Sequence, residues 1–443
     1  MKKQYEKPFI KRQQGGITNK FGRTTQSKIK DHIDGKNVSD LVKQYGSPLF
    51  VYSESTITKK YNELTHAFAL RYPKFQPAWS YKTNYLSAIC QKFHKLGSWA
   101  EVVSEMEYGM ALKLGVNPQK IIFNGPFKPY DALKEAISKG SMVNIDSMDE
   151  VYDVEKIAAE LGRTVNVDIR VNMALGNYMA WDRFGFNIES GVAMQAARRL
   201  LVGGKVNIRG LHCHVGTFIL DPDIYRKQTE QLISFGKQLS SEFGVKIEYI
   251  DIGGGFASRN RLKNTYLATD DMTPSFNSFA EAVCDQLLAA FKPNELPLLI
   301  AETGRALIDE AGSLVATVGA SKRLNNGTRA IILDAGVNLL FTAFWYDHEI
   351  SPAVDRGFAL EDQVIYGPLC MQIDVVHPMV KLPNMERGDH LVIHPVGAYN
   401  NTQWMQFIHL RPNVVMIGEN GAVTVIREKE NIDYLQRLEH LPE

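Results

Sequence analysis

The sequence has little that would direct the chain to a membrane, to nucleic acid or to an oxidising compartment. It holds no apolar run long enough to cross a bilayer. Its formal net charge of +1 gives no electrostatic case for a nucleic-acid or anionic-lipid partner. Four of its 443 residues are cysteine, and Cys90, Cys213, Cys284 and Cys370 form no CxxC pair. A cytoplasmic protein with reduced thiols is the simplest interpretation.

The N-terminal residues 1–16 are basic and polar and lack the apolar core of a signal peptide, so we expect a flexible tail there. Apolar and charged fractions of 44% and 22% are typical of a globular protein. The length exceeds that of one small domain and fits a barrel of roughly 250 residues plus a second domain.

From about residue 77, short β-rich segments alternate with amphipathic stretches. The predicted strands are Pro77–Thr83, Trp99–Ser104, Ile121–Gly125, Val143–Asp146, Val165–Val171, Ile208–His214, Ile247–Gly253 and Leu298–Gly304. Tyr130–Lys139, Met148–Leu161 and Ile224–Phe243 are among the stretches with helical periodicity. This alternation predicts a parallel sheet, and eight strand segments favour a closed (β/α)₈ (TIM) barrel. A doubly wound open sheet is the alternative, which normally has fewer units and a switch point.

After Arg305 strand-like runs follow one another with few helices. They are Leu314–Ser321, Thr328–Leu333, Gln363–Tyr366, His390–Ile393, Val414–Ile417 and Ala422–Ile426. Turn residues at 325–327 and 419–421 separate them, which predicts an antiparallel β domain. The earlier apolar run Pro48–Tyr52 is expected to join it. We therefore divide the chain into a tail and strand (1–53), a barrel (54–306) and a C-terminal β domain (307–443).

The first candidate catalytic residue is Lys82, in the run SYKTN at 80–84. If the strand continues through this run, Ala78, Ser80 and Lys82 share a face and the amine is aimed into the barrel mouth. Burial would lower the pKa of Lys82, and the amine could form a Schiff base with an aldehyde. A surface lysine near a strand end is the alternative.

Two histidines, His212 and His214, lie two residues apart in HCHVGT and would share a strand face. They could bind a metal, but no third ligand stands at an obvious spacing, so we expect no metal site. A ring packed against a flat cofactor fits better, and a buried structural histidine is the alternative.

Two glycine-containing segments indicate a phosphate site. Gly253–Gly255 follow a strand and can offer backbone N–H groups, although the run is not GxGxxG and a tight turn is the alternative. The run ETGR ends the last barrel strand, where Gly304 and Arg305 could bind a phosphate and Glu302 would lie deep in the barrel. A structural ion pair is the alternative for this segment.

Two residues of the β domain also have chemical potential. Cys370 follows Gly367-Pro368-Leu369 and is a candidate acid or base on a loop, and Tyr399 follows Gly397-Ala398. For any single cysteine, a buried structural role is the default alternative.

Taken in order from about Gly46 to Ile417, these segments resemble the fold-type III pyridoxal 5′-phosphate (PLP) decarboxylases. The resemblance is strongest to the diaminopimelate decarboxylase branch, with the ornithine and arginine decarboxylases as cousins. It implies a barrel of the alanine racemase type with a β domain, the cofactor PLP, an amino-acid substrate and a homodimer. Thr303 stands where the family usually has proline, a backbone position.

The resemblance also implies the role of each motif residue. Lys82 matches the lysine joined to PLP, His214 the ring stacked on the pyridine, and Glu302 the carboxylate paired with the pyridine nitrogen. The phosphate contacts that the family implies are Thr217, Gly254, Gly255, Gly304, Arg305 and Tyr399. Cys370 matches a catalytic cysteine, and in relatives it and Tyr399 are supplied across the dimer interface.

Two departures bear on the substrate. The family carries an arginine at the position of Thr342, where it grips a substrate carboxylate, and an acidic residue at the position of Met371, where it binds a distal amine. Threonine supplies no bidentate charged fork. Tyr346 keeps the family pattern. We therefore expect a larger or less charged amino-acid derivative as substrate, with meso-diaminopimelate in lysine biosynthesis as the alternative.

Three other hypotheses stay open at this point. An amino-acid racemase could share the scaffold, but alanine racemase places an arginine at the ring nitrogen where this chain has Glu302. A PLP carrier protein would be a single barrel without the β domain. A degenerate relative that binds PLP without catalysis is separable only by an activity measurement.

Overall fold

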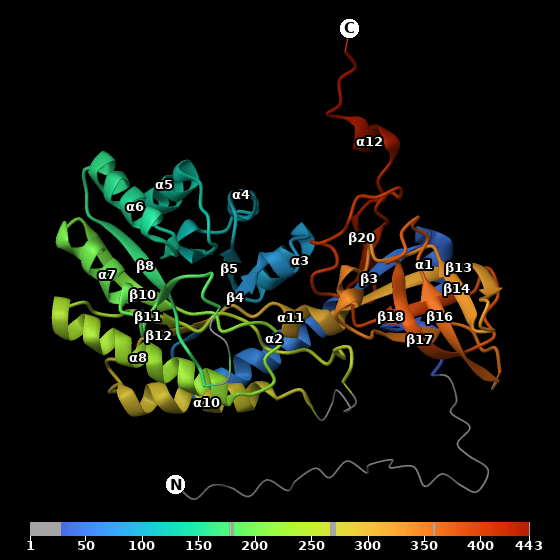
Figure 1. The fold of residues 1–443 in the computed structure, drawn as a ribbon, viewed down its shortest axis with the longest axis horizontal. Coiled ribbons are helices and arrows are strands. Elements are labelled where there is room, and N and C mark those ends of the chain that lie inside the picture. The colour runs from blue at the N-terminus through green and yellow to red at the C-terminus, as the bar shows by residue number, and fades with distance from the viewer. Residues whose placement is uncertain (1–27, 177, 179–180, 266–271, 358, 443) are drawn as a thin grey trace, which may run out of the picture.

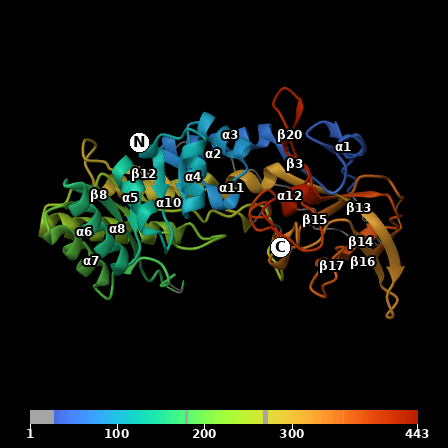
Figure 2. The same cartoon turned by 90° about the horizontal axis from the view of Figure 1, so that it is seen from above.

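The computed structural model describes residues 28–176, 178, 181–265, 272–357 and 359–442. The expected tail, residues 1–16, lies outside the described residues. The described part is elongated, with a barrel at one end of the long axis and a β domain at the other (Figures 1 and 2).

The barrel is closed by eight parallel strands, which confirms the predicted fold. They are β4 (Phe75–Ser80), β5 (Trp99–Val102), β6 (Ile121–Phe123), β7 (Met142–Ile145), β8 (Val165–Asn172), β10 (Val206–His212), β11 (Tyr249–Asp251) and β12 (Leu298–Ala301). Closure comes from the pairing of β8 with β10 and of β12 with β4. The short strand β9 (Phe186–Asn187) is a branch beside β8.

Helices cover the outside of the barrel (Figure 1). They are α2 (Glu54–Ala69), α3 (Ser87–Lys95), α4 (Glu105–Lys113), α5 (Tyr130–Lys139), α6 (Met148–Leu161), α7 (Val192–Val202), α8 (Asp223–Phe243) and α10 (Phe276–Ala290). Serine caps start several of them. The Ser147 hydroxyl accepts a hydrogen bond from the N–H of Glu150 at the start of α6, and Ser104 does the same for Glu107 at α4. Gly162 ends α6 in the left-handed conformation that favours glycine.

The β domain is built around a strand from the N-terminal side of the barrel. Its strands are β3 (Leu49–Ser53), β13 (Gly312–Arg323), β14 (Arg329–Leu333), β15 (Glu349–Pro352), β16 (Leu360–Tyr366), β17 (Val375–Pro383), β18 (His390–His394), β19 (Val414–Ile417) and β20 (Val423–Arg427). β3, which contains most of the run 48–52, pairs within this domain and lies between β13 and β19. Most pairs are antiparallel, whereas β14–β16 and β3–β19 are parallel.

β15, β17 and several short elements were not predicted. The two-residue strands β1 (His32–Ile33) and β2 (Lys36–Asn37) form a hairpin before α1 (Val38–Tyr45), and α12 (Ile432–Gln436) lies near the C-terminus. One cluster of buried apolar side chains extends from the barrel and its helices into the β domain. A smaller cluster lies between α1 and strands of the β domain.

The β domain is hydrogen-bonded to the mouth of the barrel, where the strands end. The backbone N–H of Tyr399 donates to the carbonyl of Thr83 at 2.8 Å, and the Thr402 hydroxyl donates to the carbonyl of Lys82 at 2.9 Å. Asn84 donates to the Tyr52 hydroxyl at 2.8 Å. The turn that carries Lys82 is therefore held by both parts of the chain.

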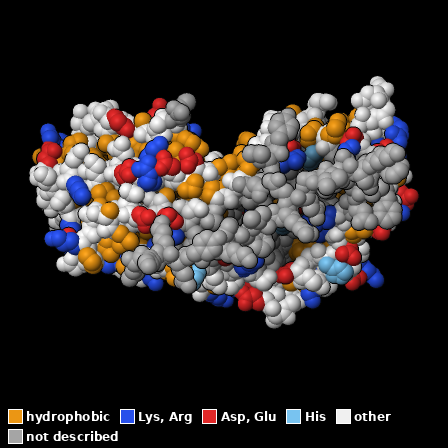
Figure 3. All heavy atoms as spheres, turned by 90° about the horizontal axis from the view of Figure 1, so that it is seen from below, with side chains coloured by type: hydrophobic (Ala, Val, Ile, Leu, Met, Phe, Trp, Pro, Cys, Tyr) orange, Lys and Arg blue, Asp and Glu red, His pale blue; other side chains and the backbone are white. Residues whose placement is uncertain are grey.

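No described helix is both long enough and apolar enough to span a bilayer. Figure 3 shows acidic and basic side chains interspersed over the described part of one face, in keeping with the small net charge.

Candidate active site

Lys82 lies at the barrel mouth, but the strand that was predicted to carry it ends before it reaches this residue. β4 ends at Ser80, and residues 81–83 form a 3₁₀ turn (η1, Tyr81–Thr83). The alternating pattern of Ala78 and Ser80 therefore stops before it reaches the lysine. The hydrogen bonds from the β domain to this turn give the physical reason, because they hold its carbonyls outside the strand ladder. The Lys82 side chain keeps 37% exposure, so it is not sealed inside the barrel.

The amine of Lys82 is paired with a carboxylate that the sequence analysis did not select. Its Nζ lies 2.7 and 2.6 Å from the two oxygens of Glu101, at the end of β5. Glu101 also accepts a hydrogen bond from the Ser80 hydroxyl at 2.5 Å. Burial lowers the pKa of an amine, but Glu101 and Glu302 outweigh burial and raise the pKa of Lys82 above its ordinary value. The expected lowered pKa is therefore wrong for this arrangement.

Glu302 sits just past β12 among polar side chains and is 4% exposed. The amide nitrogen of Asn124 donates to its Oε1 at 2.5 Å, and Nε2 of His212 lies 3.2 Å from its Oε2. Burial raises the pKa of a carboxyl, yet His212 and Lys82 overcome this effect and the pKa of Glu302 is lowered. A carboxylate held ionised in a buried site suits a cationic or protonated partner.

His214 lies two residues past the end of β10, so it does not share a strand face with His212. Its Nδ1 accepts a hydrogen bond from the N–H of Gly254 at 3.1 Å, which leaves the proton of a neutral ring on Nε2. Burial first, and then the charges of Lys82 and Arg170, lower the pKa of His214 well below its ordinary value. The neutral ring is fixed by backbone and is suited to packing against a flat group.

Arg305 carries the clearest sign of an anion site. Its Nε and Nη1 atoms are buried and have no hydrogen-bond partner among the described residues. Its guanidinium lies 4.6 Å from the ring of Tyr399, 5.1 Å from that of Tyr346 and 5.9 Å from that of Phe218. Aromatic faces stabilise the cation but satisfy no N–H group. A planar fork with free donors matches the oxygens of a phosphate.

Backbone segments meet closely beside Arg305. A Cβ on Gly254 would lie 2.4 Å from the carbonyl oxygen of Glu302, and one on Gly255 would lie 2.3 Å from that of Gly216. A Cβ on Gly304 would likewise collide with the Thr83 side chain. These contacts explain why glycine is needed where the loops converge. The N–H of Gly254 is engaged by His214, and Thr217 is exposed nearby on the loop after β10.

Cys370 and Met371 lie on the loop between β16 and β17. Asp374 shapes this loop, because its carboxylate accepts hydrogen bonds from the N–H groups of Val337 and Leu369 at 2.7 Å each. Cys370 is exposed and Met371 is half-buried. The default of a buried structural cysteine therefore does not apply to Cys370.

Thr342 is buried, with 2% exposure, in the short 3₁₀ helix η4 (Phe341–Phe344). Its hydroxyl lies 2.9 Å from Nε2 of His348 and 2.9 Å from the side-chain oxygen of Asn400. Burial lowers the pKa of His348 to about 3, so this ring adds no positive charge. Tyr346 is also buried, and its ring contacts Arg305 and Phe218.

Sequence reasoning missed three residues of the site and did not assign a fourth, His212, to its position beside Glu302. Glu101, Asn124, His212 and Asp251 belong to separate strand–loop units and meet only when the barrel closes. One signal was available, because each lies within one residue of the carboxyl end of a strand. The side-chain atoms of His212, Asp251 and Glu302 that could bind a metal lie within 4.8 Å of one another, a grouping that sequence spacing did not indicate.

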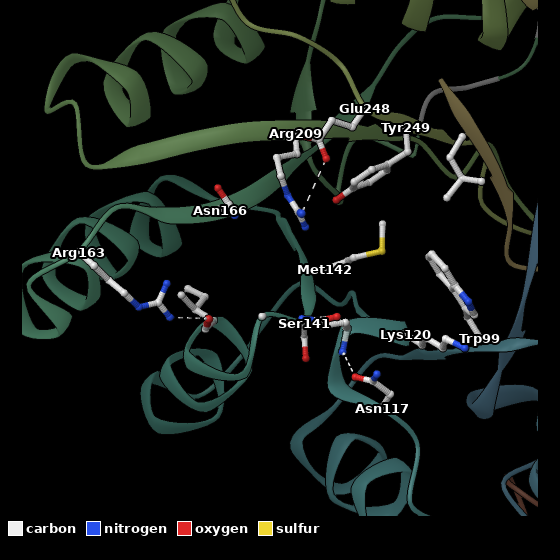
Figure 4. A pocket seen from close by; sticks show the side chains of 14 residues that line it. Trp99, Asn117, Lys120, Ser141, Met142, Arg163, Asn166, Arg209, Glu248 and Tyr249 are labelled. Atoms are coloured by element: carbon white, nitrogen blue, oxygen red, sulfur yellow. Dashed lines mark hydrogen bonds and ion pairs between the residues drawn. The ribbon is translucent and has the colours of Figure 1, made fainter. Parts of the chain in front are cut away.

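A hollow of about 590 Å³ lies at the opposite end of the barrel. Trp99, Met142, Tyr249 and Leu298, the first residues of their strands, line it together with Arg209 and Glu248 (Figure 4). None of the predicted site residues is among the described residues around it. This end of a TIM barrel usually serves stability rather than catalysis. The chemistry-bearing groups are therefore separated from it by the length of the barrel.

Comparison with known proteins places these groups in a family. Residues 54–309 match the family model described as pyridoxal-dependent decarboxylase, pyridoxal binding domain. The chain belongs to this family. It is 33% identical over 425 residues to the diaminopimelate decarboxylase of Methanocaldococcus jannaschii, covering 91% of this chain and 94% of that protein. The diaminopimelate decarboxylase of Aquifex aeolicus is 30% identical over 419 residues, again covering 91% and 94%.

Solved structures of related decarboxylases have the same fold as this chain. The crystal structure of the M. jannaschii diaminopimelate decarboxylase in complex with L-lysine has a TM-score of 0.85 and 31% identity, and covers 95% of this chain and 98% of that one. A lysine/ornithine decarboxylase from Vibrio vulnificus, at 20% identity and a TM-score of 0.72, shares the fold. This family member is a PLP-dependent amino-acid decarboxylase, a carboxy-lyase whose cofactor is PLP.

The residues at the mouth fit PLP. Arg305 has unused buried donors for a phosphate, Glu302 is an ionised carboxylate for a ring nitrogen, and Lys82 offers an amine at the barrel mouth. The bound cofactor supplies an electron sink for the pair of electrons left when CO₂ departs. The protein positions the groups around that sink.

Proposed function

We propose that this enzyme decarboxylates an amino acid or amino-acid derivative that is larger or less charged than meso-diaminopimelate. The observation that carries the proposal is the buried Thr342, whose hydroxyl is held by His348 and Asn400. Members of the family that grip a substrate carboxylate use an arginine at this position. A neutral hydroxyl that is already hydrogen-bonded offers no comparable anchor.

The surrounding side chains support this substrate class. Phe341 contacts Phe344 and Trp345 edge-on, with ring centroids 5.4 and 5.1 Å apart. Phe344 and Trp345 are 36% and 47% exposed, so this aromatic cluster offers apolar surface beside Tyr346. Met371 stands where relatives have an acidic residue, so a distal amine would also lose its partner. An apolar substituent on the substrate matches these changes better than a charged one.

In this proposal Lys82 holds the cofactor covalently, His214 packs on its ring and Glu302 faces its nitrogen. Arg305 binds the phosphate with help from Thr217, Gly254, Gly255, Gly304 and Tyr399. Cys370, or the released amine of Lys82, delivers a proton to the substrate carbon that has lost CO₂. An ionised Glu302 favours decarboxylation over racemisation, because it stabilises a protonated ring nitrogen and so a stronger electron sink.

We further propose a homodimer in which Cys370 reaches the active site of the other subunit. The exposed position of Cys370 supports this. The division into residues 1–53, 54–306 and 307–443, and the cytoplasmic location, remain predictions.

The second candidate is decarboxylation of meso-diaminopimelate itself. It is favoured by the relatives at 33% and 30% identity, which are named for that activity.

A substrate panel separates the two candidates. CO₂ release would be measured on PLP-loaded protein with meso-diaminopimelate, lysine, ornithine, arginine and apolar or aromatic derivatives, and with Lys82→Ala as the blank. We expect the highest kcat/KM for a substrate without a second free carboxylate. Efficient turnover of meso-diaminopimelate would overturn the proposed substrate class, and loss of chirality without CO₂ would indicate a racemase.

A further inference from the structure

We propose that Asp251, as a neutral carboxylic acid, and His212 are positioning residues that hold Glu302 ionised and fixed in the direction of the cofactor ring. The inference rests on the proposed pairing of Glu302 with the cofactor nitrogen.

Three adjacent strands place His212, Asp251 and Glu302 beside one another. His212 ends β10, Asp251 ends β11, and Glu302 comes directly after β12. His212 and Asp251 are paired in register across β10 and β11. The three side chains are 1%, 0% and 4% exposed, respectively. His212 and Asp251 therefore lie next to Glu302 in a buried row at the ends of these strands.

Each oxygen of Glu302 has a neighbour in this row or beside it. Asn124 donates to Oε1 at 2.5 Å and His212 lies 3.2 Å from Oε2. Asn124 is itself oriented by Asn144, whose amide donates to its oxygen at 2.7 Å. The carboxyl of Asp251 is anchored at its Oδ1 by the N–H of Gly253 at 2.8 Å. One oxygen of Asp251 therefore remains to face Glu302.

Charge decides which carboxyl keeps a proton. Carboxyl oxygens of Asp251 and Glu302 lie within 4.8 Å in a buried site, and two such groups cannot both ionise at modest cost. Glu302 has His212 and Lys82 to stabilise its charge, whereas burial and the charge of Glu302 raise the pKa of Asp251 well above its ordinary value. The proton therefore stays on Asp251, whose Oδ2 is buried, has no other hydrogen-bond partner among the described residues and is free to donate to Glu302.

This arrangement makes a sharp distinction between two substitutions. Asparagine at position 251 can accept from Gly253 with its oxygen and donate to Glu302 with its nitrogen, as the neutral acid does. Alanine at 251 removes both interactions. If Asp251 acts as a neutral donor, Asp251→Asn keeps the function that Asp251→Ala loses.

The experiment measures the PLP dissociation constant, by the change in protein fluorescence on titration with PLP, together with kcat/KM. We expect Asp251→Asn to stay within about threefold of the parent in both. We expect Asp251→Ala to weaken both by about 10- to 100-fold, the range found when a group that orients a ligating side chain is removed. In a Glu302→Gln background, Asp251→Ala should add less than about threefold, because its effect passes through Glu302.

A second pair of variants protects the test against misfolding of Asp251→Ala, which circular dichroism would reveal. His212→Gln retains a donor near Oε2 of Glu302, and His212→Leu does not. We expect the glutamine variant to bind PLP more tightly than the leucine variant by about 10-fold.

Three results would overturn the inference: equal damage from Asp251→Asn and Asp251→Ala, a silent Asp251→Ala, or a full effect of Asp251→Ala in the Glu302→Gln background. Stoichiometric zinc binding that requires His212, Asp251 and Glu302 would also overturn it. If the parent binds PLP but releases no CO₂ from any substrate, the proposed function fails. The PLP affinities would still decide the inference.

Discussion

Two buried carboxyl groups, one at each end of the barrel, have pKa values shifted in opposite directions. At the mouth, Glu302 is surrounded by His212, Lys82 and Asn124, and its pKa is lowered although it is buried. At the floor, Asp168 on β8 is also fully buried, but burial raises its pKa to about 7, and Tyr249 and Arg209 only partly oppose the rise. The mouth provides partners that keep Glu302 charged beside the neutral Asp251, whereas the floor leaves Asp168 without enough partners to offset its burial.

This difference shows what distinguishes a working site from a merely polar region. The floor hollow in Figure 4 has arginine, glutamate and tyrosine side chains, but the Arg209–Glu248 pair is 3.8 Å apart. At the mouth, Lys82 touches both oxygens of Glu101 and Arg305 keeps unused donors. Preorganised charges and free donors, rather than polarity alone, indicate catalysis.

The largest expected effect comes from removing the amine at the mouth. Lys82→Ala should lower kcat by about 10³-fold or more, because it removes the group that attaches the cofactor. Borohydride reduction followed by mass spectrometry should find PLP on residue 82 of the parent and not of the variant. Lys120→Ala, a change at the floor hollow, is the matched control and should leave kcat unchanged. Labelling at another lysine would contradict the assignment.

The sequence was a good guide to the barrel and a weaker guide to its mouth. The bounds of α5 and α6 agree with the predicted stretches, because amphipathic periodicity and serine or glycine caps are local signals. The turn at Lys82 was predicted as strand, since its conformation depends on hydrogen bonds from Tyr399 and Thr402, more than 300 residues away.

The ion pair between Lys82 and Glu101 also could not be predicted from the sequence. Glu101 was not predicted as a site residue. The residues around it in the sequence do not indicate that its carboxylate, near the end of β5, contacts the lysine that follows β4. The expected pKa of Lys82 was wrong for the same reason, as the sequence counted burial and not the neighbouring carboxylates. Motif positions are local, whereas electrostatics is a property of the closed barrel.

The next effect tests whether the mouth is completed by another subunit. Cys370→Ala should lower kcat by about 10²-fold, the contribution of a general acid. Hybrid dimers of Lys82→Ala with Cys370→Ala should recover part of the activity, because one barrel then has an intact lysine and receives an intact cysteine.

Hybrids of Lys82→Ala with Glu302→Ala are the control, since each barrel carries one defect and should stay inactive. Native mass spectrometry would verify that hybrids form. Equal inactivity of both hybrid types would argue against a shared site.

A smaller effect is expected at the phosphate. Arg305→Lys keeps the charge but loses the planar fork, and should weaken PLP binding by about 10- to 100-fold, corresponding to about 1.5–3 kcal/mol for a charged hydrogen bond. Arg411 lies 5.2 Å from the ring of Trp404 in a similar cation–π contact and pairs with Glu430, so Arg411→Lys is the matched control. PLP titration of both variants checks the prediction. Equal losses would show that aromatic packing, not free donors, matters.

The smallest expected effect concerns Asp168, the buried acid at the floor of the barrel. The pKa of Asp168 is about 7 in the folded protein against an ordinary value of 3.8. Between these values the unfolded chain has released a proton that the folded chain keeps, so stability falls as the pH rises, and the penalty is complete above about pH 7. Asp168→Asn removes the penalty and keeps the shape.

Its melting temperature should therefore exceed that of the parent by about 2 °C or more near pH 8 and by progressively less toward pH 5. Calorimetry across this range makes the measurement, and kcat should not change, because Asp168 lies far from the mouth. At the mouth the pH dependence has the opposite sign. The pKa of Glu302 is lowered, so its charged form stabilises the fold at pH values above the ordinary pKa of a glutamate. Glu302→Gln should therefore lower the stability in that pH range. A stability gain from both substitutions would erase the distinction between the two ends.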